Sequence, residues 1–216
     1  MENLVENISK SVAIELLFEE MPTRPTANAI FREARKIFGD INIINRDEND
    51  IEFSVDKFVA YNEDNTTSPV VLAMGNITDF DDKVAVSEFE RTQIWNVANS
   101  EELLSKYKYA VKIWDVNAQR QIPKERAIML VDWLNVALKL YPKCQAIWIK
   151  SAGKLQLAQS IKNLKETGIV KYLYSMVNIR FFNVPNTNEF IVDSVGLANI
   201  GLSDVQFHFK GMNPNK

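Results

Sequence analysis

A strand–helix–strand pattern that occurs twice is the feature of the sequence that most limits the possible folds. In the first copy, apolar residues alternate with other residues from Val12 to Phe18, which is the period of a β-strand. An apolar stripe at helical spacing follows over residues 27–38, and Gly39 stands where a helix commonly ends. A second strand is predicted at residues 41–44, which completes the unit.

The second copy has the same order of elements. A strand is predicted at Ala110–Val116, and a helix begins at Pro123, where a proline suits the first turn. Pro142 stops that helix, and the apolar run Cys144–Ile149 predicts the next strand. The two copies share little residue identity, and no linker rich in Pro, Gly or Ser separates them.

The remaining segments are predicted from alternation, capping patterns and helical spacing. They are a hairpin at Ile41–Ile44 and Ile51–Val55, a strand at Pro69–Met74, a helix opened by Ser87-x-x-Glu90 that carries Ile94, Val97 and Ala98, a lysine-rich helix at Leu155–Lys165, and strands at Val177–Phe182, Glu189–Asp193 and Val205–Phe209. We therefore predict a single α+β domain over residues 8–212, in which a mixed sheet built from the two strand–helix–strand units carries packed helices. Residues 8–82 and 107–212 are possible pseudo-duplicated halves.

Composition places the chain among ordinary globular proteins. It has 216 residues, of which 46% are hydrophobic and 25% charged. No window approaches the roughly 20 apolar residues that span a bilayer, and the first residues lack the basic and apolar regions of a secretory signal. Cys144 is the only cysteine, so no disulfide can form within the chain. We expect a cytoplasmic protein without membrane contact.

Several site chemistries are excluded by residue counts. His208 is the only histidine, which removes histidine-rich zinc sites and the paired-histidine metalloprotease helix. The run from Gly196 to Ser203 has the glycine spacing of a phosphate-binding loop, but leucine replaces the required lysine, which favours a structural loop. Asp79, Asp81 and Asp82 precede a helix and are interpreted as caps rather than cation ligands. We expect neither a metal nor a cofactor.

One polar cluster is a candidate catalytic or anion-binding site. Alternation in the last strands places Arg180, Gln206 and His208 on one face if the strands are neighbours, with Asp193 near its edge. A histidine oriented by a carboxylate and accompanied by an arginine suits acid–base chemistry. The simpler alternative is a polar sheet face in which Asp193 caps the turn before Gly196.

Charge is divided unevenly along the chain, although its net value is only −3. Residues 40–102 contain fifteen Asp and Glu against four Lys and Arg, whereas residues 139–171 contain seven Lys against one Glu. An acidic region steers a basic partner and repels nucleic acid, although solubility alone would also explain it. The lysine-rich helix predicted at Leu155–Lys165 lacks arginine and interleaved aromatics, so we expect no nucleic-acid binding. The candidate contact residues are Asp47, Glu48, Asp50, Glu63, Asp64, Asp79, Asp81 and Asp82.

The C-terminal segment carries a resemblance to a known family. The motifs are the strand Asn178–Asn183, the turn Asp193–Leu197 and the run Gly201–Gly211, which ends in Gln-Phe-His-Phe-Lys-Gly. They are similar to those of a bacterial family of unknown function, the domain of unknown function numbered four-two-six-one. Ser203 stands where proline is common in that family, and Lys210 where arginine is common. The family has no established activity, and the similarity to accessory proteins of bacterial competition implies an interaction role.

These observations lead to a non-enzymatic protein-binding module. Its most specific form is a cytoplasmic immunity protein that binds and neutralises a cognate bacterial toxin, with a basic toxin domain as the partner. One alternative is an enzyme or small-ligand-binding protein that uses Arg180, Asp193 and His208. Another is an adaptor subunit of a secretion apparatus.

Overall fold

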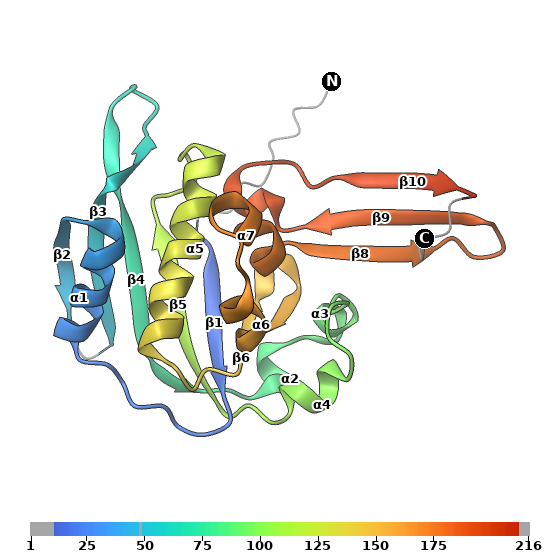
Figure 1. The fold of residues 1–216 in the computed structure, drawn as a ribbon, viewed down its shortest axis with the longest axis horizontal. Coiled ribbons are helices and arrows are strands. Elements are labelled where there is room, and N and C mark those ends of the chain that lie inside the picture. Colours follow the sequence, from blue (N-terminus) through green and yellow to red (C-terminus); the bar gives the residue numbers. More distant parts are fainter. Residues whose placement is uncertain (1–10, 48, 212–216) are drawn as a thin grey trace.

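A seven-stranded sheet forms the centre of the molecule (Figure 1). The computed structural model describes residues 11–47 and 49–211. The spatial order of the strands is β2-β3-β4-β5-β1-β6-β7. Their bounds are β1 Ala13–Phe18, β2 Ile41–Arg46, β3 Asp50–Tyr61, β4 Thr67–Asp79, β5 Tyr109–Val116, β6 Ala146–Ile149 and β7 Lys154–Leu157.

The helices connect these strands and cover the sheet. The main ones are α1 (Ala27–Phe38), α5 (Pro123–Leu140) and α7 (Gly168–Met176), and the shorter ones are α2 (Asp82–Ala85), α3 (Glu88–Thr92), α4 (Ser100–Leu104) and α6 (Ala158–Asn163), with 3₁₀ turns at η1 (Lys150–Ala152) and η2 (Leu197–Ile200). Sheet and packed helices together are an α+β fold, which confirms the predicted class.

Both predicted strand–helix–strand units are present, as β1-α1-β2 and β5-α5-β6. Every neighbouring pair in the sheet is antiparallel, so the sheet is not the mixed one that was predicted, and β1 lies between β5 and β6. The two strands of each unit consequently run parallel to each other with other strands between them. The seven-stranded sheet and the helices α1 to α7, together with the residues that connect and flank them (residues 11–177), are called the body below.

Alternation along the strands divides the core between the two faces of the sheet. Ile14, Leu16 and Phe18 of β1 pack on the face that α1 and α5 cover. Leu17 points to the other face, where it joins a smaller cluster contributed by the segment from Phe80 to Tyr107. α5 is buried on most of its sides, because α7 and η2 contact it opposite the sheet. Each face of the central strands therefore has its own covering layer.

Two predicted helices differ in the structure. The Ser87–Glu90 capping box is present, but α3 ends at Thr92 and does not include Ile94, Val97 or Ala98. The lysine-rich segment predicted as one helix at 155–165 is strand β7 followed by α6. The cause is tertiary: Leu155 pairs with Trp148 of β6 and is fully buried beside it, so pairing overrides helical spacing. Residues 8–10, 48 and 212 of the predicted domain lie outside the described residues.

A second sheet projects from the side of the body as an arm (Figure 1). It consists of β8 (Asn178–Asn183), β9 (Glu189–Val195) and β10 (Gln206–Lys210) in the order β10-β9-β8, all antiparallel. It begins directly after α7. Within residues 11–47 and 49–211, no helix has the length and apolar character needed to cross a membrane.

Candidate functional site

The strand register gives the arm two chemically different faces. Arg180, Asp193 and Gln206 lie opposite one another across its three strands, and His208 lies one row further along on the same face. The structure therefore places Arg180, Gln206 and His208 on one face, as alternation predicted. Their strands are not direct neighbours, because β9 lies between them and puts Asp193 in the middle of that face rather than at its edge. We call this the polar face of the arm.

Arg180 and the buried Asn178, which donates to the carbonyl oxygens of Gln93 and Gly153, both link the polar face to the body. The Nε of Arg180 donates to Oδ1 of Asp193 at 2.8 Å, and a terminal nitrogen donates to the other carboxylate oxygen. The guanidinium also donates to the side-chain oxygen of Gln93, beyond the end of α3, and lies 5.3 Å from the ring centre of Phe182. Trp95 packs edge-on against Phe182, with ring centres 4.6 Å apart. These contacts tie the base of the arm to the loop that follows α3.

His208 pairs with a different carboxylate from the one suggested by the sequence. Its Nε2 lies 3.0 Å from Oε2 of Glu189, and Lys210 reaches the other oxygen of the same carboxylate at 3.5 Å. Asp193 is occupied by Arg180. Arg180, Asp193 and His208 therefore do not form one cluster. Arg180 pairs with Asp193, and His208 pairs with Glu189, so each of the three has a partner within the arm. This arrangement favours structural pairing over acid–base chemistry.

The glycine-punctuated loop between β9 and β10 is a structural turn. The carboxylate of Asp204 accepts hydrogen bonds from the backbone N–H groups of Gly196 and Leu197 at 3.3 and 3.0 Å. It occupies the place where a phosphate-binding loop would hold its anion. Gly196 has φ of 120°, and a Cβ there would lie 2.9 Å from the carbonyl oxygen of Met176. The loop therefore requires glycine for its own backbone and packing.

The acidic candidates are distributed over separated parts of the body. Glu63 and Asp64 lie in the β3–β4 turn, at the end of that hairpin opposite to Asp47 and Asp50. Asp79, Asp81 and Asp82 lie at the end of β4 and the start of α2, and Glu48 lies outside the described residues. No single acidic surface collects all of them.

Most of these carboxylates also have local partners. Asp47 accepts the backbone N–H groups of Asn49 and Asp50, which lowers its pKa. Glu63 is paired with Arg120, and that hydrogen bond lowers the pKa of Glu63. Asp81 caps α2, as the capping interpretation predicted. Among the described residues, no three His, Cys, Asp or Glu side chains are grouped so that they could hold a metal ion.

The opposite face of the arm is apolar, and sequence analysis did not identify it as a site. Its residues alternate with those of the polar face: Ile179, Phe181, Phe190, Val192, Phe207 and Phe209. The rings of Phe181 and Phe190 have centres 5.4 Å apart, and those of Phe190 and Phe209 5.7 Å apart. We call this the apolar face of the arm.

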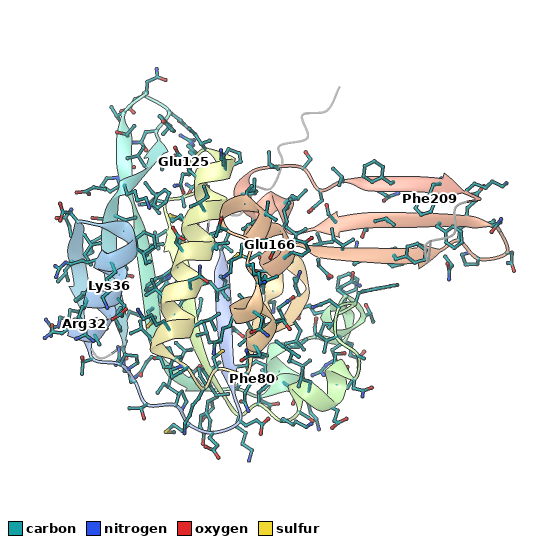
Figure 2. All side chains as sticks on the ribbon, viewed as in Figure 1. Arg32, Lys36, Phe80, Glu125, Glu166 and Phe209 are labelled. Carbon is teal, nitrogen blue, oxygen red and sulfur yellow. The ribbon has the colours of Figure 1, made fainter. Side chains whose placement is uncertain are left out.

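The apolar face is partly exposed to solvent: four of its six apolar side chains are half-buried and two are exposed. Phe207 is 65% exposed and Ile179 is 59% exposed. The arm extends away from the body (Figure 1), and its side chains, including Phe209, lie along it beyond the helices (Figure 2). The alternation of Phe207 and Phe209 with polar residues is visible in the sequence. The sequence does not show that the described helices leave this face uncovered, because that depends on where the arm leaves the body.

Comparison of the chain with models of protein families, with curated proteins and with solved structures gives no match. The resemblance of the C-terminal segment to the family numbered four-two-six-one stays a prediction from the sequence.

Proposed function

We propose that the protein is a binding module whose contact surface is the apolar face of the arm. The observation that supports this is a cluster of stacked, half-buried aromatic rings beside the exposed Phe207, on a sheet that no helix of the described residues covers along its length. Contiguous exposed apolar surface is unfavourable in water, and on soluble proteins it commonly marks an interaction site. Aromatic side chains are also the commonest anchors of protein interfaces.

The proposed occupant is an amphipathic helix of another protein. In the body, α1 and α5 cover one face of the large sheet, whereas no helix of the described residues forms such a layer on the apolar face of the arm. The outer strands of a three-stranded sheet are roughly 10 Å apart, which is close to the diameter of about 10–12 Å of a single helix. The apolar face carries no charged side chain, and its polar positions are Asn183 and Ser194. Its counterpart would be a stripe of apolar side chains.

A second copy of the chain is a weaker occupant. Five residues on each of three strands form a face of roughly 250 Å². Stable interfaces bury about 800 Å² on each partner, so two arms packed face to face fall well short. A different protein can add contacts beyond the helix, for example at the outer edge of β10, with which no further strand of the described residues pairs.

The resemblance supplies a more specific form of the proposal, in which the partner is a bacterial toxin domain and the chain is its immunity protein. A basic toxin surface would suit the acidic residues of the body, whereas the arm suits an apolar helix. The two contact surfaces are separable because Glu63 and Asp64 lie on the β3–β4 turn of the body, away from the arm.

The test is calorimetric binding to the product of the neighbouring gene, using Phe207→Ser with Phe89→Ser as a matched control. Phe89 is likewise exposed, but it lies on α3, which is linked to the polar face. We expect micromolar or tighter binding, a loss of at least tenfold for Phe207→Ser, and no change for Phe89→Ser. A Glu63→Lys/Asp64→Lys variant that loses binding while Phe207→Ser keeps it would place the contact on the acidic turn instead.

Two other outcomes would overturn the proposal. One is the absence of any complex at micromolar concentration. The other is a concentration-dependent dimer, measured by light scattering, that Phe207→Ser dissolves, because the apolar face would then be occupied by a second copy.

A further inference from the structure

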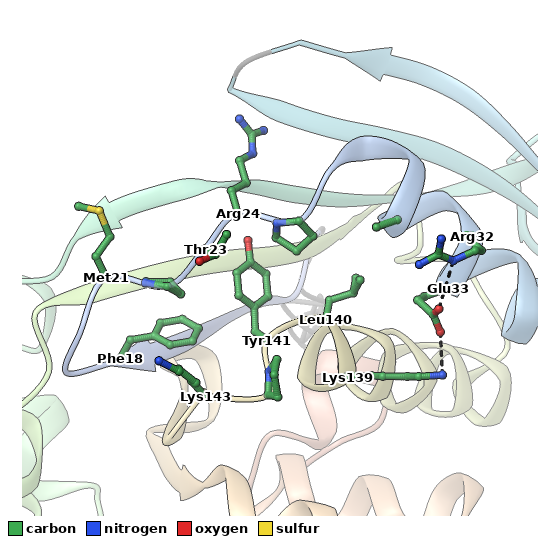
Figure 3. Close-up of a pocket in the computed structure, with 14 residues that line it drawn as sticks. Phe18, Met21, Thr23, Arg24, Arg32, Glu33, Lys139, Leu140, Tyr141 and Lys143 are labelled. Carbon is green, nitrogen blue, oxygen red and sulfur yellow. Dashed lines mark ion pairs between the residues drawn. The ribbon is translucent and has the colours of Figure 1, made fainter.

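A cavity of about 500 Å³ lies in the body, on the side where α1 begins and α5 ends (Figure 3). The loop between β1 and α1 forms one wall, and the last turn of α5 with the turn that follows forms the other. Phe18, Pro25 and Leu140 contribute apolar surface. Ligand sites for small molecules have volumes of roughly 300–1,000 Å³ and are mainly apolar with a few polar groups. The size and lining therefore suit a small organic molecule.

Tyr141 is a buried polar residue of this cavity. It is 2% exposed, and its ring lies 5.6 Å from that of Phe18. The hydroxyl points toward the loop at Thr23 and Arg24 (Figure 3), and it has no hydrogen-bond partner among the described residues. Buried hydroxyl groups in native proteins nearly always have a partner. A ligand that accepts a hydrogen bond would supply one.

The hydroxyl is suited to donate rather than to ionise. Burial raises the pKa of Tyr141 to about 12, although the charge of Arg24 opposes the rise. The group therefore keeps its proton throughout the physiological pH range.

The charged residues that line the cavity are mostly cationic. Lys143 follows Tyr141 by two residues in the same turn, and no ion pair of Lys143 is formed within the described chain. Lys139 and Arg32 lie at the other end, where Glu33 holds them at 2.7 and 3.6 Å. Hydrogen bonds from Lys139 and Lys36 lower the pKa of Glu33 to about 2. This carboxylate therefore stays ionised and fixes Lys139 at the rim (Figure 3).

We propose that the cavity binds a small organic anion, a carboxylate or a phosphate carried on an apolar body. The anionic group accepts the hydrogen bond of Tyr141 and lies near the ammonium of Lys143. The apolar body packs against Phe18 and Leu140. This site is separate from the arm and does not depend on its function.

The first experiment is an NMR titration of backbone amides with four probes: phenyl phosphate, hexanoate, and their neutral counterparts benzyl alcohol and 1-hexanol. We expect saturable shifts at residues 21–25 and 139–143, with each anion binding at least fivefold more tightly than its neutral counterpart. The stronger of the two anions distinguishes phosphate from carboxylate as the natural group. Absence of saturable shifts up to 20 mM, or equal binding of the neutral probes, would overturn the proposal.

The second experiment compares Tyr141→Phe with Tyr172→Phe. Tyr172 is also buried, but its hydroxyl donates to the carbonyl oxygen of Gly196 at 2.9 Å, away from the cavity. Tyr141→Phe should weaken anion binding roughly fivefold to tenfold and leave the melting temperature unchanged or higher, because no internal hydrogen bond is lost. Tyr172→Phe should lower the melting temperature and leave binding unchanged. If Tyr141→Phe binds the anions as well as wild type, or is destabilised as much as Tyr172→Phe, the hydroxyl serves the fold and the proposal is wrong.

Discussion

The body and the arm are both built from antiparallel sheet, yet they are stabilised in different ways. In the body, helices cover the sheet and side chains such as Phe53 and Trp133 are fully buried against each other, with ring centres 5.3 Å apart. In the arm, three strands rest on their own pairing, on rings stacked along a partly exposed face, and on the hydrogen bonds of Arg180 and Asn178 to the body. Burial is the dominant source of folding free energy. Most of the stability of the fold therefore comes from the body, whereas the apolar face of the arm contributes less to stability and can contact a partner.

An ion pair between an arginine and an aspartate occurs in each region, so the contribution of the pair to stability can be compared directly. In the body, Arg126 and Asp115 are fully buried, 2.9 Å apart, and Asp115 also accepts the backbone N–H of Val12. Burial raises the pKa of Asp115, and the charge of Arg126 opposes that rise. In the arm, Arg180 and Asp193 are 17% and 15% exposed.

We expect the largest effect from Arg126→Met, which leaves a carboxylate buried without its cation. The free energy of unfolding should fall by about 3–5 kcal/mol, whereas Arg180→Met should cost about 1–2 kcal/mol because solvent screens the remaining charge. Urea unfolding followed by circular dichroism measures both. Adding Asp115→Asn to Arg126→Met should recover part of the loss. Equal costs for the two arginine variants would contradict the division between body and arm.

The junction between the two regions depends on a buried lysine. Lys154 of β7 donates to the carbonyl oxygens of Tyr174, at 2.8 Å, and of Val177, the residue just before β8. Burial lowers the pKa of Lys154 to about 8. The amine thus holds the end of α7 where the arm begins, at the cost of desolvating its charge.

This arrangement predicts a dependence of stability on pH. Between pH 8 and about pH 10.5 the unfolded chain binds more protons at Lys154 than the folded protein does, so the free energy of unfolding rises with pH. The rise should be on the order of 1–3 kcal/mol. It should be absent from Lys154→Met, and the difference between the two proteins removes contributions from other titrating groups. A difference that stays constant from pH 7 to pH 10.5 would exclude this role for Lys154.

Local patterns in the sequence predicted much of the body. Alternation identified β1 and β5, and the stripe ending at Gly39 identified α1, because these signals depend on a few consecutive residues. The prediction of a helix in the lysine-rich segment was wrong, because Leu155 pairs with Trp148 of the neighbouring strand β6. α7 was not predicted, although Ile169, Tyr172 and Met176 recur at helical spacing and pack on the core.

The candidate sites show the same limit. Alternation predicted which residues of the arm share a face, and the register places them so. It did not show that the apolar face lacks a covering layer. The cavity was also missed, because Phe18 and Tyr141 are distant in sequence and meet only through the fold. Both the apolar face and the cavity therefore depend on how segments distant in sequence are placed in the fold, which local patterns do not show.

The smallest predicted effect on stability concerns Phe207. Because 65% of its surface is already exposed, Phe207→Ser removes little buried area and should change the free energy of unfolding by less than about 0.5 kcal/mol. Phe53→Ser in the body, at 0% exposure, should cost more than about 3 kcal/mol. Thermal and urea unfolding of the two variants measure the contrast. A loss above roughly 1.5 kcal/mol for Phe207→Ser would mean that the apolar face is packed in solution, and the arm would then be stabilised by burial in the same way as the body.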